Sequence, residues 1–199
     1  MQDFIDLVSP FWLALAVGLI ALLSLSLLFL RRRRQRREGL GYALTSAAVD
    51  RIEDVFLPDG MGGEIHVEQL LLTIKGILVI NVKQFKGVVF ASDRMDEWTV
   101  IGPKGRSAFP NPLGDLYDRV AAVRQLVRDV NVTGYLLFPA DADFSKGRPK
   151  DVLLPVELRE NFARPPRSEV KTVIERFATP WENIRGVARP AKSRPPRLS

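Results

Sequence analysis

Two consecutive runs of strand-forming residues set the strongest limit on how this chain can fold. The first run covers residues 63–73 and the second 76–83, with Lys75 and Gly76 at the junction, so the pair is predicted to form a hairpin. The second run is apolar at every position from Ile77 to Ile80, which is typical of a central strand covered on both faces. Such a strand needs a layer on each side, and the hairpin therefore predicts a layered α/β domain.

Polar residues lie together at one end of the predicted hairpin. Glu68 belongs to the first run, and Asn81 and Lys83 end the second. Residues 81 and 83 share a face because side chains alternate along a strand. We therefore expect Asn81 and Lys83 to point at one site beside Glu68.

The remaining pattern predicts further strands and two helices around this hairpin. Asn111 is a good N-cap with Pro112 at the first helical position, and Ser168 is expected to cap a second helix. An apolar stripe at spacings of three and four follows Asn111, formed by Leu113, Leu116, Val120, Val123 and Val127. Strands are expected over 51–57, 87–91, 98–101, 132–138 and 152–154. Residues 39–50 are interpreted as a linker with one or two helical turns.

The order of these residues resembles the nuclease-related domain (NERD) family. The core of that family runs Ile-Asp-His-Leu-Leu-Leu-Thr, a short turn, Gly-Ile-Phe-Val-Ile-Glu-x-Lys and then Gly. The matching segments here are 67–73, 76–83 and Gly87. Later matches are Trp98 and the Asn-Pro-Leu signature of Asn111, Pro112 and Leu113, so the resemblance spans residues 51–138.

The resemblance implies a restriction-endonuclease-like fold, in which helices flank a mixed central β-sheet, and a site of the PD-(D/E)xK type. In such a site acids hold Mg²⁺ or Mn²⁺, the metal activates water, and a lysine stabilises charge at a DNA phosphate. Carried onto this chain, the resemblance assigns Glu68, Asn81 and Lys83 as the catalytic positions, with Glu68 as a metal ligand.

Asn81 is the departure that matters most for this chemistry. Glu68 replaces an aspartate of the family and keeps the charge, whereas Asn81 replaces a glutamate and leaves a neutral amide. Asn81 is then either a weak oxygen ligand or a buried amide bonded to its neighbours. Lys83 either acts at the phosphate or pairs with Glu68. The glutamate that the family carries on an opening helix has no clear counterpart here.

Other polar residues are secondary candidates for the same site. Glu64 and His66 alternate with apolar neighbours, so they either replace the ligand missing at Asn81 or form the solvated face of a strand. Asp115 stands where the family has glutamine, and it either complements the helix dipole or adds a carboxylate. Trp98 is interpreted as a core residue rather than a base-stacking platform.

Composition excludes several kinds of chemistry. The chain has no cysteine and one histidine, so disulfides, cysteine-based zinc sites and clusters of imidazoles are ruled out. Its net charge of +6 is concentrated in residues 31–37 and 185–199, which leaves residues 38–184 slightly acidic. This distribution counts against broad nonspecific nucleic-acid binding by the domain itself, because such binding rests on Lys and Arg.

The N-terminal thirty residues predict a membrane anchor. Residues 10–30 carry no charge, and an uncharged helix of about twenty residues crosses ~30 Å of hydrocarbon. Trp12 lies where an interfacial aromatic belt belongs. Six arginines follow directly: Arg31, Arg32, Arg33, Arg34, Arg36 and Arg37.

A cleaved signal peptide is the competing interpretation, but it would have basic residues before the apolar run, where this chain has Asp3 and Asp6. The positive-inside rule keeps the arginines cytoplasmic. We therefore expect a single-pass inner- or plasma-membrane protein with its N-terminus outside, residues 11–30 in lipid and its C-terminal domain in the cytoplasm. The arginines either set this topology and contact anionic lipid, or form an arm that holds DNA.

The sequence thus predicts four segments: a tail and transmembrane helix (1–30), a juxtamembrane linker (31–50), a NERD-like domain (51–184) and a basic disordered tail (185–199). Two functions remain open. The favoured one is a degenerate nuclease-related module that binds DNA or protein at the cytoplasmic membrane face. The alternative is an active nuclease that uses Mg²⁺ or Mn²⁺ to hydrolyse phosphodiester bonds in DNA.

Overall fold

The computed structural model describes residues 39–103 and 105–191. The chain divides into two units, residues 1–37 and 38–199, and all of the described residues belong to the second unit. The predicted membrane segment and the arginine run lie outside the described residues. Within the described ranges, no helix is long and apolar enough to cross a membrane.

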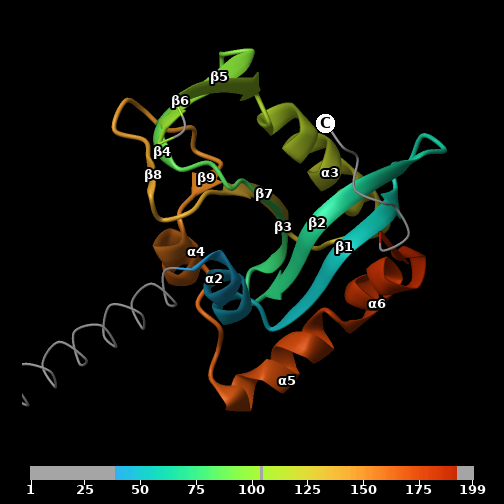
Figure 1. Ribbon diagram of the computed structural model, residues 1–199. Helices are drawn as coiled ribbons and strands as arrows, with labels where there is room; N and C mark the ends of the chain where they lie inside the picture. Colours follow the sequence, from blue (N-terminus) through green and yellow to red (C-terminus); the bar gives the residue numbers. More distant parts are fainter. Residues whose placement is uncertain (1–38, 104, 192–199) are drawn as a thin grey trace, which may run out of the picture. The chain divides into compact units, whose positions relative to one another are not determined.

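A six-stranded mixed sheet forms the centre of the domain (Figure 1). Its strands run in the order β10-β1-β2-β3-β7-β9. The bounds are β1 Asp50–Pro58, β2 Glu64–Thr73, β3 Gly76–Val82, β7 Val132–Leu137, β9 Val152–Leu153 and β10 Arg189–Pro190. The predicted hairpin is β2 and β3, which pair antiparallel from Thr73↔Gly76 to Gln69↔Ile80. Residues 76–81 of β3 are all buried, as expected for a central strand.

A second, smaller sheet follows β3 in the chain. It consists of β6-β5-β4-β8, with β4 Gly87–Phe90, β5 Glu97–Gly102, β6 Gly105–Pro110 and β8 Ala142–Asp143. Strands β4 and β5 were expected, but β6 was not. Its sequence shows no apolar alternation, and five of its six residues are exposed, so its pairing with β5 rather than burial makes it a strand.

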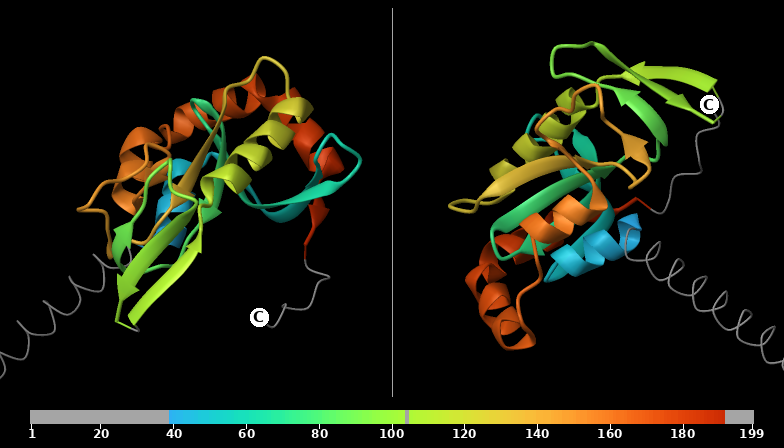
Figure 2. Two further views of the ribbon diagram at one scale, coloured as in Figure 1. Left: turned by 90° about the horizontal axis from the view of Figure 1, so that it is seen from above. Right: turned by 90° about the vertical axis from the view of Figure 1, so that its left-hand side faces the viewer.

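Helices cover both faces of the large sheet (Figure 2). Helix α3, Leu113–Leu126, follows β6 of the small sheet, leads into β7, which is parallel to β3, and packs with α6, Ala178–Val187, on one face. Four residues of its predicted stripe are buried within the helix, and the fifth, Val127, is buried just after its end. Gly134 of β7 allows this contact, since a Cβ there would lie 2.4 Å from a methyl group of Val120. The expected α/β sandwich around a mixed sheet is therefore confirmed.

The other face of the sheet carries α2, Leu40–Ala47, and α4, Pro155–Asn161. Ala43, Leu44 and Ala47 are buried against α4 and the sheet in a second core cluster. The expected helical turns are therefore present, but residues 40–47 belong to the core and do not form a linker. Their apolar side chains pack into the domain as a two-turn helix, so the folded unit begins before residue 51.

The C-terminal part of the described chain is also more ordered than its composition indicates. Helix α5, Arg167–Arg176, begins one residue before Ser168, so the prediction that Ser168 caps it is wrong. Helix α6 follows, and β10 then pairs with β1. Residues 185–190 thus belong to the fold, because Arg185 pairs with Asp50 and Arg189 with Glu64. Residues 192–199 lie outside the described residues.

Near the middle of β1 and β2, the alternation of side chains between the two faces of the sheet is interrupted in both strands. Ile65 and Val67 contact the α3-side core, as do Leu70 and Leu72, so the apolar period of two is interrupted between 67 and 70. The β1–β2 register skips the pair 54 and 68, where Asp54 has a φ of 51°. This interruption determines where the side chain of Glu68 goes.

Candidate functional site

Glu68 lies where β2 and β3 separate. Regular pairing between these strands stops at Gln69↔Ile80, while β3 continues against β7 as far as Val82↔Leu137. In place of a main-chain acceptor, the Oε2 atom of Glu68 accepts the backbone N–H of Val82 at 2.8 Å. The carboxylate therefore joins the two strands at the point where they separate. One of its two oxygens is already hydrogen-bonded to the backbone.

Asn81 is buried in the same place. Its side chain is 1% exposed, and its Oδ1 atom has no hydrogen-bond partner among the described residues. Thr73, at the other end of the hairpin, is equally buried, but its hydroxyl donates to Gly76 O and accepts from Lys75 N. A buried polar atom without a hydrogen-bond partner lowers the free energy of unfolding. The burial of Asn81 should therefore destabilise the fold, whereas the burial of Thr73 should not.

Lys83 completes the group of residues predicted from the hairpin. Burial lowers the pKa of Lys83, while the negative charge of Glu68 opposes this shift. Arg119 lowers the pKa further, and Asp115 raises it. The four side chains therefore lie close enough to interact, and the expectation that Lys83 and Glu68 lie side by side agrees with this electrostatic coupling.

Arg119 was not identified from the sequence, although it is bonded directly to the backbone of the site. Its Nε donates to His66 O on β2 at 2.7 Å, and its Nη1 donates to Asp115 O at 2.7 Å. The side chain is 16% exposed. Arg119 thus anchors α3 to β2 beside Glu68. The sequence signal was an arginine one turn after Asp115, which is common on any exposed helix.

The secondary candidates Glu64 and His66 bind other partners. Glu64 accepts from Arg189 Nη1 at 2.9 Å, and His66 Nε2 lies 2.7 Å from Asp54 Oδ1. His66 also contacts the ring of Phe56. Neither of these polar contacts involves Glu68, because the interrupted alternation in β2 separates the side chains on the two sides of position 68. Asp115 is largely exposed in the first turn of α3.

The Asn-Pro-Leu signature serves the local structure at the start of α3. The Nδ2 of Asn111 donates to Met95 O at 2.8 Å, and its Oδ1 accepts the N–H of Leu113 at 3.0 Å. Pro112, rather than Asn111, is the residue that precedes the helix, one position later than expected. Trp98, the other late match, is fully buried and donates to Ser92 O, which agrees with its interpretation as a core residue.

The residues at this site do not fit the metal centre that a PD-(D/E)xK nuclease uses. Such a centre needs hard oxygen ligands, with carboxylates to balance the charge of the cation. Here Glu68 accepts the Val82 N–H, Asp115 is largely exposed and lies 3.7 Å from Arg119, and the third position is a neutral amide. Across residues 39–103 and 105–191, no three acidic or histidine side chains are grouped so that they could hold a metal ion.

A separate surface pocket of about 320 Å³ lies between α3 and β7. The hydroxyl of Tyr117 at its rim donates to Asp151 Oδ2 at 2.7 Å, and this bond raises the pKa of Tyr117 to about 12. The pocket shares no lining residue with the Glu68, Asn81 and Lys83 group.

Comparison with known proteins gives one match. The nuclease-related domain (NERD) family matches residues 41–139, a range that begins in α2 and ends just after β7. No curated protein and no solved structure matches the chain. The matched range contains the hairpin, the Glu68, Asn81 and Lys83 group, the small sheet up to β6, and α3. The chain therefore carries a nuclease-related domain of the NERD family over residues 41–139.

Proposed function

We propose that this nuclease-related domain is a degenerate one: a module that binds DNA or protein without cutting phosphodiester bonds, held at the cytoplasmic face of a membrane. The observation that carries the proposal is Asn81. A neutral amide, 1% exposed and with an unpartnered Oδ1, stands at the position where the family pattern has a metal-binding acid.

The neighbours of Asn81 support the loss of cleavage. A catalytic divalent cation is held by carboxylates whose charge offsets its own, and it lowers the pKa of a bound water. Glu68 is already partly engaged, since its Oε2 accepts the Val82 N–H at 2.8 Å. Glu64 and His66, which could have compensated, are paired with Arg189 and Asp54. Two cations, Lys83 and Arg119, instead balance the charge of Glu68 and Asp115.

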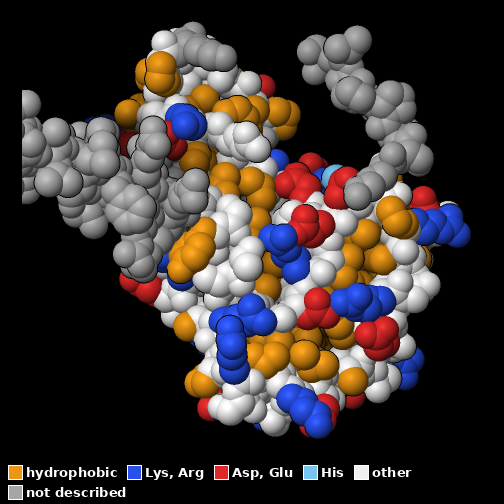
Figure 3. Space-filling model, turned by 60° about the horizontal axis from the view of Figure 1, so that its bottom comes forward, with side chains coloured by type: hydrophobic (Ala, Val, Ile, Leu, Met, Phe, Trp, Pro, Cys, Tyr) orange, Lys and Arg blue, Asp and Glu red, His pale blue; other side chains and the backbone are white. Residues whose placement is uncertain are grey.

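The membrane location rests on the sequence of the N-terminal unit. Residues 10–30 are long and apolar enough to span a bilayer, and the arginine run 31–37 supplies the cytoplasmic charge. The first helix of the domain begins at Leu40, three residues after Arg37. On the face of the domain in Figure 3, Lys and Arg side chains alternate with Asp and Glu instead of forming one basic patch. Such a face favours a selective partner over unselective contact with nucleic acid.

Cleavage and metal binding test the proposal directly. The purified full chain in detergent should be incubated with supercoiled and linear DNA in Mg²⁺ and in Mn²⁺, and Mn²⁺ binding should be measured by calorimetry. We expect no cleavage and no Mn²⁺ binding. DNA cleavage that disappears in Lys83→Ala would show that the alternative, an active nuclease, is correct.

Asn81→Glu is the matched variant. It restores the acid of the family pattern opposite Glu68 at the same buried position, so we expect the variant to bind Mn²⁺ where the unaltered chain does not. If both chains bind Mn²⁺ equally, Asn81 is not the residue that removes the metal site, and the proposal loses its main support.

A further inference from the structure

The pocket between α3 and β7 exists because β9 is short. Strand β9 begins at Val152, opposite Leu136, and so does not extend beside residues 133–135 of β7, which line the pocket. Helix α3 and residues 150–151 enclose the space that a longer β9 would fill. The pocket volume of about 320 Å³ lies at the lower end of the range for small-ligand pockets, about 300–1,000 Å³. A small molecule therefore fits this pocket.

Two cations line the pocket, one on each side. Arg124 belongs to α3, and Lys150 lies two residues before β9. Neither forms an ion pair with a carboxylate in the part of the chain that the structure describes. The pocket therefore presents two positive charges that the fold itself does not pair.

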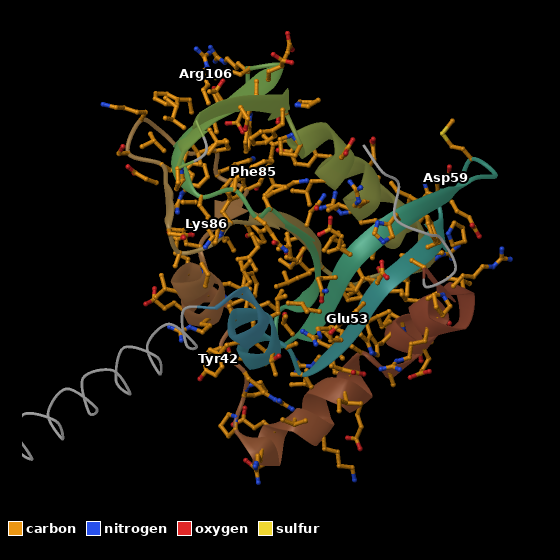
Figure 4. The ribbon with its side chains drawn as sticks, in the orientation of Figure 1. Tyr42, Glu53, Asp59, Phe85, Lys86 and Arg106 are labelled. Atoms are coloured by element: carbon orange, nitrogen blue, oxygen red, sulfur yellow. The ribbon has the colours of Figure 1, made fainter. Side chains whose placement is uncertain are left out.

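Cations elsewhere on these elements and near the small sheet do have carboxylate partners. Lys86 lies where β4 begins (Figure 4). The ion pairs are Arg119–Asp115 on α3, Arg148–Glu157 around β9 and Lys86–Asp141 beside β4 and β8. The absence of such a partner at the pocket thus distinguishes Arg124 and Lys150 from these neighbours.

Asp151 is the one carboxylate among the described residues that line the pocket, and it is already engaged. The Tyr117 hydroxyl donates to its Oδ2 at 2.7 Å. One negative charge therefore faces two positive charges, and the balance favours an anionic ligand.

The hydrogen-bond donors of the pocket are positioned by the fold and retain capacity for a ligand. Arg124 donates to Val132 O through Nε and Nη2, at 3.3 and 2.8 Å, which fixes the guanidinium and leaves Nη1 to bind a ligand. The hydroxyl oxygen of Thr133, another lining residue, is buried and makes no hydrogen bond within the described chain. A buried hydroxyl without a partner destabilises the fold, and an acceptor oxygen of a ligand would satisfy it.

We propose that this pocket binds a small phosphate monoester that carries an aromatic group. A phosphate monoester has up to about two negative charges and three strong acceptor oxygens, which suit two cations and a hydroxyl. Tyr117, Val120 and Tyr135 form the rest of the lining and provide apolar contact for an aromatic group. The proposal does not rest on the nuclease-related site, because the pocket shares no lining residue with it.

Calorimetry of the full chain in detergent tests the proposal, with phenyl phosphate as the probe. We expect saturable one-to-one binding that weakens as NaCl is added, because salt screens the charges of the pocket. Phenol, which has the same ring without the phosphate, should not bind. The proposal is overturned if phenyl phosphate does not bind, or if phenol binds equally well.

Two variants of lysine show whether the pocket is the binding site. Lys150→Ala should weaken the binding of phenyl phosphate about tenfold, because it removes one charge-assisted contact. Lys146→Ala is the matched control, since Lys146 is an exposed lysine four residues earlier that does not line the pocket. It should bind phenyl phosphate as the unaltered chain does. Equal affinities in the two variants would exclude the pocket as the site.

Asp151→Asn separates binding at the pocket from a general disturbance of the fold. The asparagine keeps an oxygen for the Tyr117 hydroxyl and removes the negative charge, so phenyl phosphate should bind about fivefold more tightly. A residue with a merely structural role would give unchanged or weaker binding when replaced. Either of those results would contradict the proposal.

Discussion

Two carboxylates join distant parts of this domain, and their surroundings differ. At the start of β1, Asp50 accepts three kinds of donor: the N–H of Arg51 at 2.7 Å, the indole N–H of Trp181 at 2.8 Å and the guanidinium of Arg185. At the end of β3, Glu68 accepts the N–H of Val82, while the adjacent Asn81 has an oxygen without a partner among the described residues. The first cluster is complete and the second is not.

The two clusters differ in whether their polar groups are explained by the stability of the fold. The Asp50 cluster attaches α6 to the sheet through Trp181 and Arg185, and the Arg51 N–H binds the second carboxylate oxygen. The Oδ1 of Asn81 makes no bond within the described chain that offsets its burial, so stability alone does not explain an amide there. The proposal that Asn81 replaces a metal-binding acid of the family pattern would account for it. Mutations at the two clusters should therefore affect stability in opposite directions.

The largest expected effect is at the complete cluster. Trp181 is 2% exposed and packs in the α3-side core, so Trp181→Ala should lower the free energy of unfolding by about 3–5 kcal/mol. Urea denaturation of the full chain in detergent measures this loss. Ile174→Ala, at a residue of α5 that is 42% exposed, is the control and should have little effect. Equal losses in both variants would show that α6 is not anchored as described.

Asp50→Ala should have a smaller effect, about 1–3 kcal/mol, because it leaves the Trp181 indole N–H without an acceptor. The variant also predicts a change in pH dependence. Burial raises the pKa of Asp50, but the bonds from Trp181, Arg51 and Arg185 outweigh it and hold the pKa below the usual 3.8.

The sign of that dependence follows from proton linkage. The folded state holds the Asp50 proton less tightly than the unfolded state, so the stabilisation is present above pH 3.8 and is lost as the pH falls through the folded pKa. Denaturation series at several acidic pH values should show a shallower loss of stability in Asp50→Ala than in the unaltered chain. Parallel curves would mean that Asp50 does not titrate with a lowered pKa.

The smallest expected effect, and the one of opposite sign, is at Asn81. Asn81→Leu removes the unpartnered Oδ1 and keeps the number and branching of the side-chain heavy atoms, so the free energy of unfolding should rise by about 1 kcal/mol. Thr73→Val, at an equally buried residue whose hydroxyl is bonded, is the matched control and should be destabilising. A destabilised Asn81→Leu variant would mean that the amide binds something essential in solution.

Local patterns were enough to predict much of the fold. The hairpin ends lie within one residue of their predicted places, since apolar runs and turn residues act over a few positions. The stripe of α3 was predicted for the same reason. The one or two helical turns expected within residues 39–50 are present as α2, but its packing on α4 was not expected, and β6 was not expected because only its bonds to β5 make it a strand.

The candidate site shows the same division. The sequence by itself determined that Glu68, Asn81 and Lys83 lie at one end of a hairpin, and it marked Asn81 as the residue in question. Only the tertiary structure decided that Glu68 accepts the Val82 N–H and that Arg119 lies beside it. It also decided that Glu64 and His66 bind other partners. These outcomes depend on where two strands diverge and which helix covers them. Contacts between residues far apart in the chain determine that geometry, and no local pattern encodes it.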